Sequence, residues 1–164
     1  MFDNWASDPE VTKFLTWPAH NDPEISARVL KSWVEDYAKA DSYQWAITLK
    51  TFGDAPIGSI GVVAFDKGTA CAEIGYCIGR RWWHRGIMSE ALSAVMGFLI
   101  GEVGVNRIQA RHDVRNPHSG AVMRKCGMRY EGTFRQAGRN QQGICDVSQY
   151  AFLAGDDPEV EDFA

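Results

Sequence analysis

Residues 78–100 read IGRRWWHRGIMSEALSAVMGFLI, so that a cluster of charged and aromatic side chains stands directly before a long apolar segment. Apolar residues recur at helical spacing after Gly86 and predict a helix over residues 87–102; they are Ile87, Ala91, Val95 and Phe98. The first turn of a helix carries amides without internal partners and a partial positive charge. Gly86 gives a ligand close access to them, and Arg81 and Arg85 add positive charge. The segment predicts an anion-binding turn; the alternative is a surface turn whose tryptophans fill the core.

Small side chains also follow one another along this predicted helix, at every fourth position: Ser89, Ser93, Gly97 and Gly101. Such a row predicts close approach of a neighbouring backbone, because a glycine inside a helix otherwise costs about 1 kcal/mol relative to alanine. The turn before the helix lacks both the GK[ST] of a Walker loop and the GxGxxG of dinucleotide-binding folds. Neither of those nucleotide sites is therefore indicated.

The patterns on either side predict one α/β (α+β) domain, a mixed, mostly antiparallel central sheet flanked by helices. Before the turn we expect a helix over 23–40, capped by Asn21 or Asp22, then strands over 43–49, 57–65 and 71–78, with GDAP at 53–56 as a turn. After it we expect strands over 107–112, 130–135 and 147–153, and a short helix over 119–126 that Gly127 ends. The strands 71–78 and 107–112 should form a parallel pair with a right-handed crossover. We assign residues 1–155 to the domain and 156–164 to an acidic, frayed tail.

Composition limits the classes of function. The chain has 164 residues and a net charge of −4, which argues against broad nucleic-acid binding, so the basic cluster before Gly86 suits a small anionic ligand better. Without a CxxC or Cys/His cluster, no metal is expected, and the four cysteines are expected as free thiols: Cys71, Cys77, Cys126 and Cys145. No signal peptide and no membrane-spanning apolar run is seen, and we expect a cytoplasmic protein.

Three stretches resemble one known family. AEIGYCIGRRWWHRGIMSEAL, residues 72–92, resembles the fourth strand, pyrophosphate loop and third helix of the GNAT superfamily of N-acetyltransferases. NRIQARHDVRNPHSGAVMRKCGMRYEGTFR, residues 106–135, is similar to the fifth strand, fourth helix and sixth strand of its RimJ/RimL-type branch, the ribosomal-protein N-terminal acetyltransferases. WASDPEVTKFLTWPAH, residues 5–20, also resembles this branch. The resemblance therefore implies acetyl-CoA (coenzyme A) as cofactor and the GNAT fold over nearly the whole chain.

The sequence departs from the superfamily pattern in two places. The loop usually reads Gln/Arg-x-x-Gly-x-Gly/Ala, whereas these positions are Trp83, Gly86 and Met88 here, and tryptophan at the first of them is common in the RimJ/RimL-type branch. The strand that family members have before the equivalent of Met1 is not found in this sequence. We therefore expect an open sheet edge at residues 43–49, unless another chain covers it.

The resemblance also implies the cofactor-binding residues. The pyrophosphate loop would consist of Trp83, His84, Arg85, Gly86, Ile87, Met88 and Ser89. The pantetheine arm would pair with the backbone of Cys77 and Ile78, where the strands splay apart, and Asn116 would hydrogen-bond this arm. The alternative for Asn116 is a turn residue before Pro117.

Two residues are candidates for catalysis. Met123 stands where many family members have the proton-donating tyrosine. The resemblance to the RimJ/RimL-type branch, which has a serine at the position of Ser119, implies that Ser119 binds the cofactor's sulfur and assists its departure; the alternative for Ser119 is a helix cap. Glu73 would accept the amine proton through water if it faces the cleft, and otherwise lies on the polar face of its strand.

These residues imply a specific reaction. The expected function is direct transfer of an acetyl group from acetyl-CoA to a primary amine, either a protein N-terminus or a small amine. The alternative is a non-catalytic acyl-CoA-binding or regulatory module on the same fold. A nucleic-acid-binding domain is disfavoured by the acidic balance. A homodimer is a possible assembly, and no membrane partner is expected.

Overall fold

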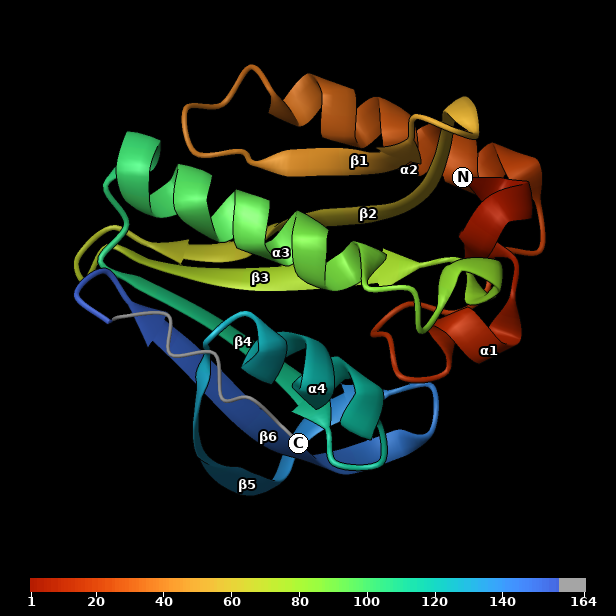
Figure 1. The fold of residues 1–164 in the computed structure, drawn as a ribbon. Coiled ribbons are helices and arrows are strands. Elements are labelled where there is room, and N and C mark those ends of the chain that lie inside the picture. Colours follow the sequence, from red (N-terminus) through yellow and green to blue (C-terminus); the bar gives the residue numbers. More distant parts are fainter. Residues whose placement is uncertain (157–164) are drawn as a thin grey trace.

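A six-stranded sheet with the order β1-β2-β3-β4-β6-β5 forms the centre of the computed structural model, which describes residues 1–156 (Figure 1). Every neighbouring pair is antiparallel except β3 and β4, which are parallel. The predicted fold class and the predicted parallel pair are both confirmed. Strand β1 stands at one edge of the sheet, so the open edge expected at residues 43–49 is also confirmed.

The strands agree with the sequence patterns near the predicted helix and are longer elsewhere. They are β1 Gln44–Leu49, β2 Gly53–Asp66, β3 Cys71–Ile78, β4 Arg107–Asp113, β5 Arg129–Asn140 and β6 Gly143–Leu153. The prediction of a turn at GDAP is wrong, because Gly53 already pairs with Leu49 and the turn lies at residues 50–52. Strands β5 and β6 form a long hairpin that extends the expected 130–135 and 147–153.

The helical elements are η1 Phe2–Ala6, α1 Pro9–Thr12, α2 Pro23–Asp36, η2 Arg80–Trp82, α3 Ile87–Phe98, η3 Leu99–Val103 and α4 Pro117–Lys125. Asp22 caps α2 as expected and accepts a hydrogen bond from the Glu24 amide (2.8 Å). The helix ends before the predicted residue 40. Tyr37, which follows Ile25, Val29 and Trp33 at a spacing of four residues, is 57% exposed. Gly127, with φ of +78°, follows the C-terminal end of α4 as predicted.

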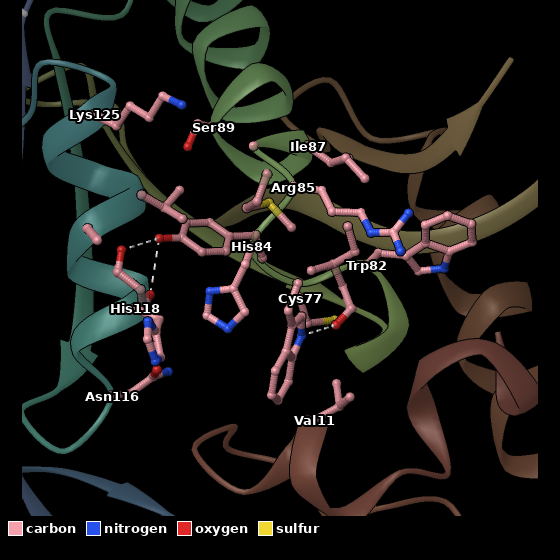
Figure 2. A pocket seen from close by; sticks show the side chains of 18 of the residues that line it. Val11, Cys77, Trp82, His84, Arg85, Ile87, Ser89, Asn116, His118 and Lys125 are labelled. Atoms are coloured by element: carbon pink, nitrogen blue, oxygen red, sulfur yellow. Dashed lines mark hydrogen bonds between the residues drawn. The ribbon is translucent and has the colours of Figure 1, made fainter. Parts of the chain in front are cut away.

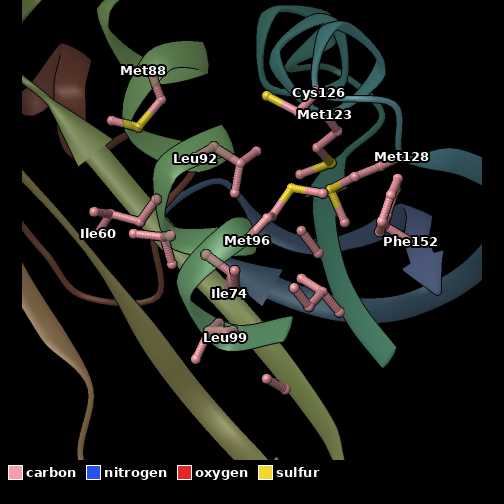
Figure 3. Close-up of a cluster of buried hydrophobic side chains, with 14 of the residues drawn as sticks. Ile60, Ile74, Met88, Leu92, Met96, Leu99, Met123, Cys126, Met128 and Phe152 are labelled. Atoms are coloured by element: carbon pink, nitrogen blue, oxygen red, sulfur yellow. The ribbon is translucent and has the colours of Figure 1, made fainter. Parts of the chain in front are cut away.

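The main core lies between the sheet and the helices α3 and α4, which lie side by side on one face (Figures 1 and 3). Leu92, Leu99, Ile108 and Met123 are fully buried there. The predicted apolar face of α3 is partly wrong, since Phe98 is 41% exposed. The helix is covered on two sides, by the sheet and by α4, so its buried residues spread around more of its circumference: Met88, Ser89, Leu92, Val95 and Met96.

The row of small residues on α3 serves close packing in its first half only. The Cys126 thiol donates a hydrogen bond to the Ser89 carbonyl oxygen (3.3 Å), and the Ser93 hydroxyl donates to the Cys126 sulfur (3.4 Å). The prediction is wrong for Gly97 and Gly101, where an added Cβ would meet no atom within 4 Å. The C-terminal end of α4 is thus held against the start of α3, next to the turn at Gly86.

Strands β3 and β4 pair over a short length. The ladder joins Cys71, Ala72 and Glu73 to residues 107–109 of β4 and stops there, although β3 continues to Ile78 along β2. The two strands separate beyond this point, as the sequence predicts. The gap leaves backbone groups of β3 without a strand partner on one side.

Candidate active site

A cavity of about 450 Å³ occupies the region between the end of β3, the turn before α3, and α4 (Figure 2). All of the predicted cofactor-binding residues line it: Cys77, Ile78, Trp83, His84, Arg85, Gly86, Ile87, Met88, Ser89, Asn116 and Ser119. Further lining residues were not assigned from the sequence: Val11, Phe14, Leu15, Tyr76, Trp82, His118, Ala121, Val122 and Lys125. The structure therefore brings the predicted set together at one site, while the role of each residue in binding stays a prediction.

The turn before α3 forms the positively charged end of the cavity. Gly86 is the N-cap of α3 with φ of +74°, and no side chain caps the helix. An added Cβ on Gly86 would lie 3.8 Å from the Nζ atom of Lys125, so this ammonium group stands over the turn. Arg85 also lines the cavity, and its guanidinium group points toward the Trp82 ring (Figure 2). The helix amides and the Lys125 ammonium group therefore face the same space, with the Arg85 charge beside it, which suits a diphosphate.

The arginines and tryptophans of the turn divide between two roles. Trp82 is buried, and the guanidinium groups of Arg81 and Arg85 lie 4.8 and 5.4 Å from its ring centre. Arg80 pairs with Asp8 (3.1 Å). Of the three arginines only Arg85 lines the cavity. The core-filling role, posed as an alternative from the sequence, is confirmed for Trp82, while anion binding at the turn stays a prediction.

The backbone of β3 presents polar groups to the gap at alternate residues. The Gly79 amide donates to the Ile57 carbonyl on β2 (2.9 Å), and Cys77 pairs with Ser59 of the same strand. Because backbone groups alternate in direction along a strand, those of Cys77 point to β2, and those of Tyr76 and Ile78 point into the gap. The prediction that an extended arm pairs with the Cys77 backbone is therefore wrong by one residue, whereas Ile78 is placed as expected.

One of these backbone groups has a partner already. The Trp83 indole N–H donates to the Ile78 carbonyl oxygen (2.9 Å), which fixes the indole ring along the cavity wall. The Ile78 amide keeps its direction into the gap. The side chain of Cys77 lies on the wall of the cavity near Val11 (Figure 2), and burial raises the pKa of its thiol.

Ser119 lies across the gap from β3, on the first turn of α4. Its hydroxyl is 3.1 Å from the phenol oxygen of Tyr76, and this phenol donates to the Ser119 carbonyl oxygen (3.0 Å). The interpretation of Ser119 as a helix cap is wrong, because α4 begins at Pro117 with Asn116 at the N-cap position. Asn116 makes no side-chain cap either, so its amide remains available to the cavity that it lines.

Glu73 lies apart from the cavity, on the sheet face opposite to Tyr76. Its carboxylate accepts hydrogen bonds from Arg111 Nε (2.8 Å) and Gln109 Nε2 (3.2 Å). Four residues of strand separate it from Cys77, a distance of ~13 Å. A role for Glu73 as the base would need a chain of waters over that distance, and it stays a prediction.

The sequence missed Tyr76 and His118 as members of the site. Tyr76 looked like an ordinary strand aromatic. The sequence leaves two interpretations for Lys125, a contact to the ribose phosphate of the cofactor or a solvated helix lysine, and the structure places it in the cavity lining. The His84 and His118 rings meet edge to face, 4.7 Å between centres, although 84 and 118 belong to different elements.

A cationic helix start joined to a gap in the sheet can hold an anionic ligand that has an extended arm. A family profile described as acetyltransferase (GNAT) domain matches residues 1–129, and the chain belongs to this family. It is an acetyl-CoA-dependent N-acetyltransferase. The N-acetyltransferase p20 of Bacillus licheniformis, itself uncharacterized, is 28% identical over 148 residues, which cover 90% of this chain and 82% of that protein.

Two solved structures share the fold. The microcin C7 self-immunity acetyltransferase MccE, in complex with acetyl-CoA and AMP, matches with a TM-score of 0.78 and 23% identity over 88% of this chain and 79% of that chain. RimL, a ribosomal L7/L12 α-N-protein acetyltransferase in complex with coenzyme A, matches with a TM-score of 0.77 and 23% identity over 87% and 79%. These likenesses show the fold.

The residues present fit acetyl-CoA. Gly86 leaves the helix amides open, Lys125 and Arg85 flank them, and the gap beside Ile78 has room for an extended arm. Within residues 1–156, no helix is both long and apolar enough to cross a bilayer.

Proposed function

We propose that the acetyl group passes directly from acetyl-CoA to the amine in the gap between β3 and α4, with no acyl-enzyme at Cys77. The observation that carries this proposal is the position of Ser119 and the Ile78 amide on opposite sides of one cavity that ends at the cationic turn. The partly buried Cys77 thiol has a raised pKa because of desolvation, which disfavours the thiolate that an acyl-cysteine route requires.

In this proposal the residues of each cavity wall bind a different part of acetyl-CoA. The amides after Gly86, with Arg85 and Lys125, hold the diphosphate of the acyl donor. The Ile78 amide donates to the oxygen of the thioester carbonyl as negative charge develops there, a contact worth roughly 3 kcal/mol in other enzymes. The Ser119 hydroxyl donates to the departing sulfur. Asn116 hydrogen-bonds the arm between these two points.

We further propose that the acceptor is a primary amine on an uncharged or apolar skeleton. The cavity beyond Cys77 ends at Val11, Phe14 and Leu15, and no aspartate or glutamate is among its described lining residues. Gln141, at the tip of the β5–β6 hairpin, donates to the Leu15 carbonyl oxygen (3.4 Å) and ties this hairpin to the segment that carries Leu15. A polyamine would need carboxylates for its additional ammonium groups. A protein N-terminus with a small uncharged first residue, or a small apolar amine, fits better.

The test of the proposed function joins binding to turnover. Calorimetry with coenzyme A and thiol release from acetyl-CoA are measured with peptide N-termini, phenethylamine and spermidine. Cofactor binding with turnover of a peptide or apolar amine supports the proposal. Binding without turnover of any acceptor supports the alternative, the non-catalytic module. A higher kcat/KM for spermidine than for every uncharged acceptor contradicts the acceptor class.

Replacing Ser119 separates its proposed role from packing. Ser119→Ala should lower kcat about tenfold and leave the dissociation constant of the cofactor nearly unchanged, because the hydroxyl acts on the sulfur only as the bond breaks. An unchanged kcat removes Ser119 from the mechanism. The exposed serine Ser32 on α2 is the matched control, since Ser32→Ala should change neither quantity.

The assembly and the location are proposals of the same kind. The open edge of β1 favours pairing with another chain, and sedimentation of the purified protein distinguishes a homodimer from a monomer. We propose a cytoplasmic location, where the protein would encounter acetyl-CoA. Fractionation of cells that express the chain tests this location.

A further inference from the structure

Tyr76 is a partly buried polar side chain in the cavity lining that has no role so far. It stands on β3, and its phenol oxygen reaches Ser119 on α4. Both of its contacts are made to Ser119: the carbonyl oxygen at 3.0 Å and the hydroxyl oxygen at 3.1 Å. Ser119, which would act on the sulfur, is thus held by Tyr76 from the other side of the gap.

The number of hydrogens limits what this pair can do. The phenol has one hydrogen and two acceptors within reach, so it donates either to the Ser119 carbonyl or to the Ser119 hydroxyl. In the first arrangement the Ser119 hydroxyl can donate back to the phenol oxygen, which draws its hydrogen away from the cavity. In the second arrangement the phenol donates to the hydroxyl, and the hydrogen of Ser119 is free to point at a sulfur.

Tyr76 can serve as a donor at every working pH. Burial raises the pKa of its phenol far above the usual value, with the contact to Ser119 opposing this only in part. The phenol therefore keeps its proton while it donates. Hydrogen bonds in a chain strengthen one another in a medium of low polarity, so a phenol that donates to Ser119 makes Ser119 a better donor.

We infer that Tyr76 is a positioning residue for acetyl transfer, which moves its hydrogen bond from the carbonyl to the hydroxyl of Ser119 as negative charge develops on the sulfur. This rests on the proposed function. In the step itself the N–C bond forms, the C–S bond breaks and its electron pair stays on the sulfur. The proton of the amine goes to water. Tyr76 and Ser119 both keep their protons and only redirect them.

The test uses the intact protein and a readout that does not depend on turnover. Binding of coenzyme A is compared with binding of desulfo-coenzyme A by calorimetry as the pH rises and the bound thiol ionises. The wild-type protein should favour coenzyme A by about tenfold at the highest pH, because a hydrogen bond to a charged sulfur is a strong one. Tyr76→Phe, which keeps the ring and its packing, should lose most of this preference, as should Ser119→Ala.

Kinetics of the single and double variants give the second readout. Tyr76→Phe should lower kcat about tenfold with KM for acetyl-CoA unchanged, and it should have no further effect in the Ser119→Ala background, since it acts through that residue. Tyr150→Phe is the matched control: Tyr150 is buried, and its phenol accepts a hydrogen bond from Arg124 Nη1 (2.8 Å) outside the cavity lining. It should change thermal stability and leave both readouts as in the wild type.

The outcomes separate this inference from the proposed function. Additive effects of the two changes, or a preference for coenzyme A that Tyr76→Phe leaves intact, overturn the role of Tyr76 while transfer itself stands. If Tyr150→Phe loses the preference for coenzyme A as Tyr76→Phe does, the loss reflects general packing, and the role of Tyr76 is likewise overturned. If the wild-type protein does not bind coenzyme A at all, the proposed function fails, and the inference fails with it.

Discussion

Replacing Gly86 by alanine tests the anion-binding turn most directly. The residue has φ of +74°, a conformation that costs an L-amino acid roughly 1–2 kcal/mol. An added Cβ would lie 3.8 Å from Lys125 Nζ, an ordinary contact, so no clash with the protein adds to this cost. For a chain of this size the cost corresponds to a fall in Tm of about 3–6 °C. The Cβ would also project into the space where a diphosphate meets the helix amides, and losing one charge-assisted hydrogen bond weakens binding about 10- to 100-fold.

The matched control is Gly104→Ala. Gly104 has nearly the same backbone conformation, with φ of +77°, and an added Cβ there would meet no atom within 4 Å. It should lose a similar amount of stability in thermal unfolding and bind coenzyme A like the wild type in calorimetry. Pantetheine, which lacks the diphosphate, should bind Gly86→Ala and wild type equally. If Gly86→Ala binds coenzyme A with wild-type affinity, or loses pantetheine in the same proportion, the diphosphate does not lie at this turn.

Three further predictions follow from the same geometry. Lys125→Ala should weaken coenzyme A binding about three- to tenfold, with a smaller effect at high salt in calorimetry, whereas Lys31→Ala on the exposed face of α2 should have none. Gly97→Ala should raise the free energy of unfolding in urea by about 0.5–1 kcal/mol, because the added Cβ on α3 meets nothing, and a loss of stability would contradict this placement. The Arg115 guanidinium holds the pKa of Asp113 well below its usual value, so the pair stabilises the fold above about pH 4, and this stability is lost as the pH falls further. Asp113→Asn should therefore be less stable at pH 7, and its unfolding free energy should depend less on pH below about pH 4. Parallel curves of unfolding free energy against pH for the variant and the wild type would refute this.

The sequence predicts the elements whose pattern is set by one buried face. Strand β3 has the predicted bounds, Cys71–Ile78, because its apolar residues alternate between turn signals. The hairpin of β5 and β6 was shortened in the prediction, because most of β5 is exposed and carries no alternation; backbone pairing to β6 holds it instead. The buried face of α3 could not be read from periodicity, since a helix covered on two sides has apolar residues around most of its circumference.

Some residues of the site could likewise be predicted from their neighbours in sequence, whereas others are brought together only by the tertiary fold. The turn at Gly86 could be found because its glycine, its charge and the following helix are contiguous in sequence. The partnership of Tyr76 and Ser119 could not, because residues 43 positions apart meet only when α4 lies across the gap. Lys125 is a similar case: nothing in its neighbourhood along the chain places an ammonium group over a turn that lies far earlier in the sequence.

The early end of the β3–β4 ladder connects these features. If the ladder continued past Glu73, the amide and carbonyl of Ile78 and Tyr76 would pair with β4, as every interior strand requires. These groups lack a strand partner because β3 stays on β2 while β4 turns away, and the Ile78 carbonyl accepts from the Trp83 indole instead. The side chain of Tyr76 bridges the resulting gap to Ser119 instead of a backbone hydrogen bond. The same separation therefore provides the room for an extended substrate, the amide for its carbonyl and the phenol that positions the serine, so that a change restoring the ladder should abolish all three at once.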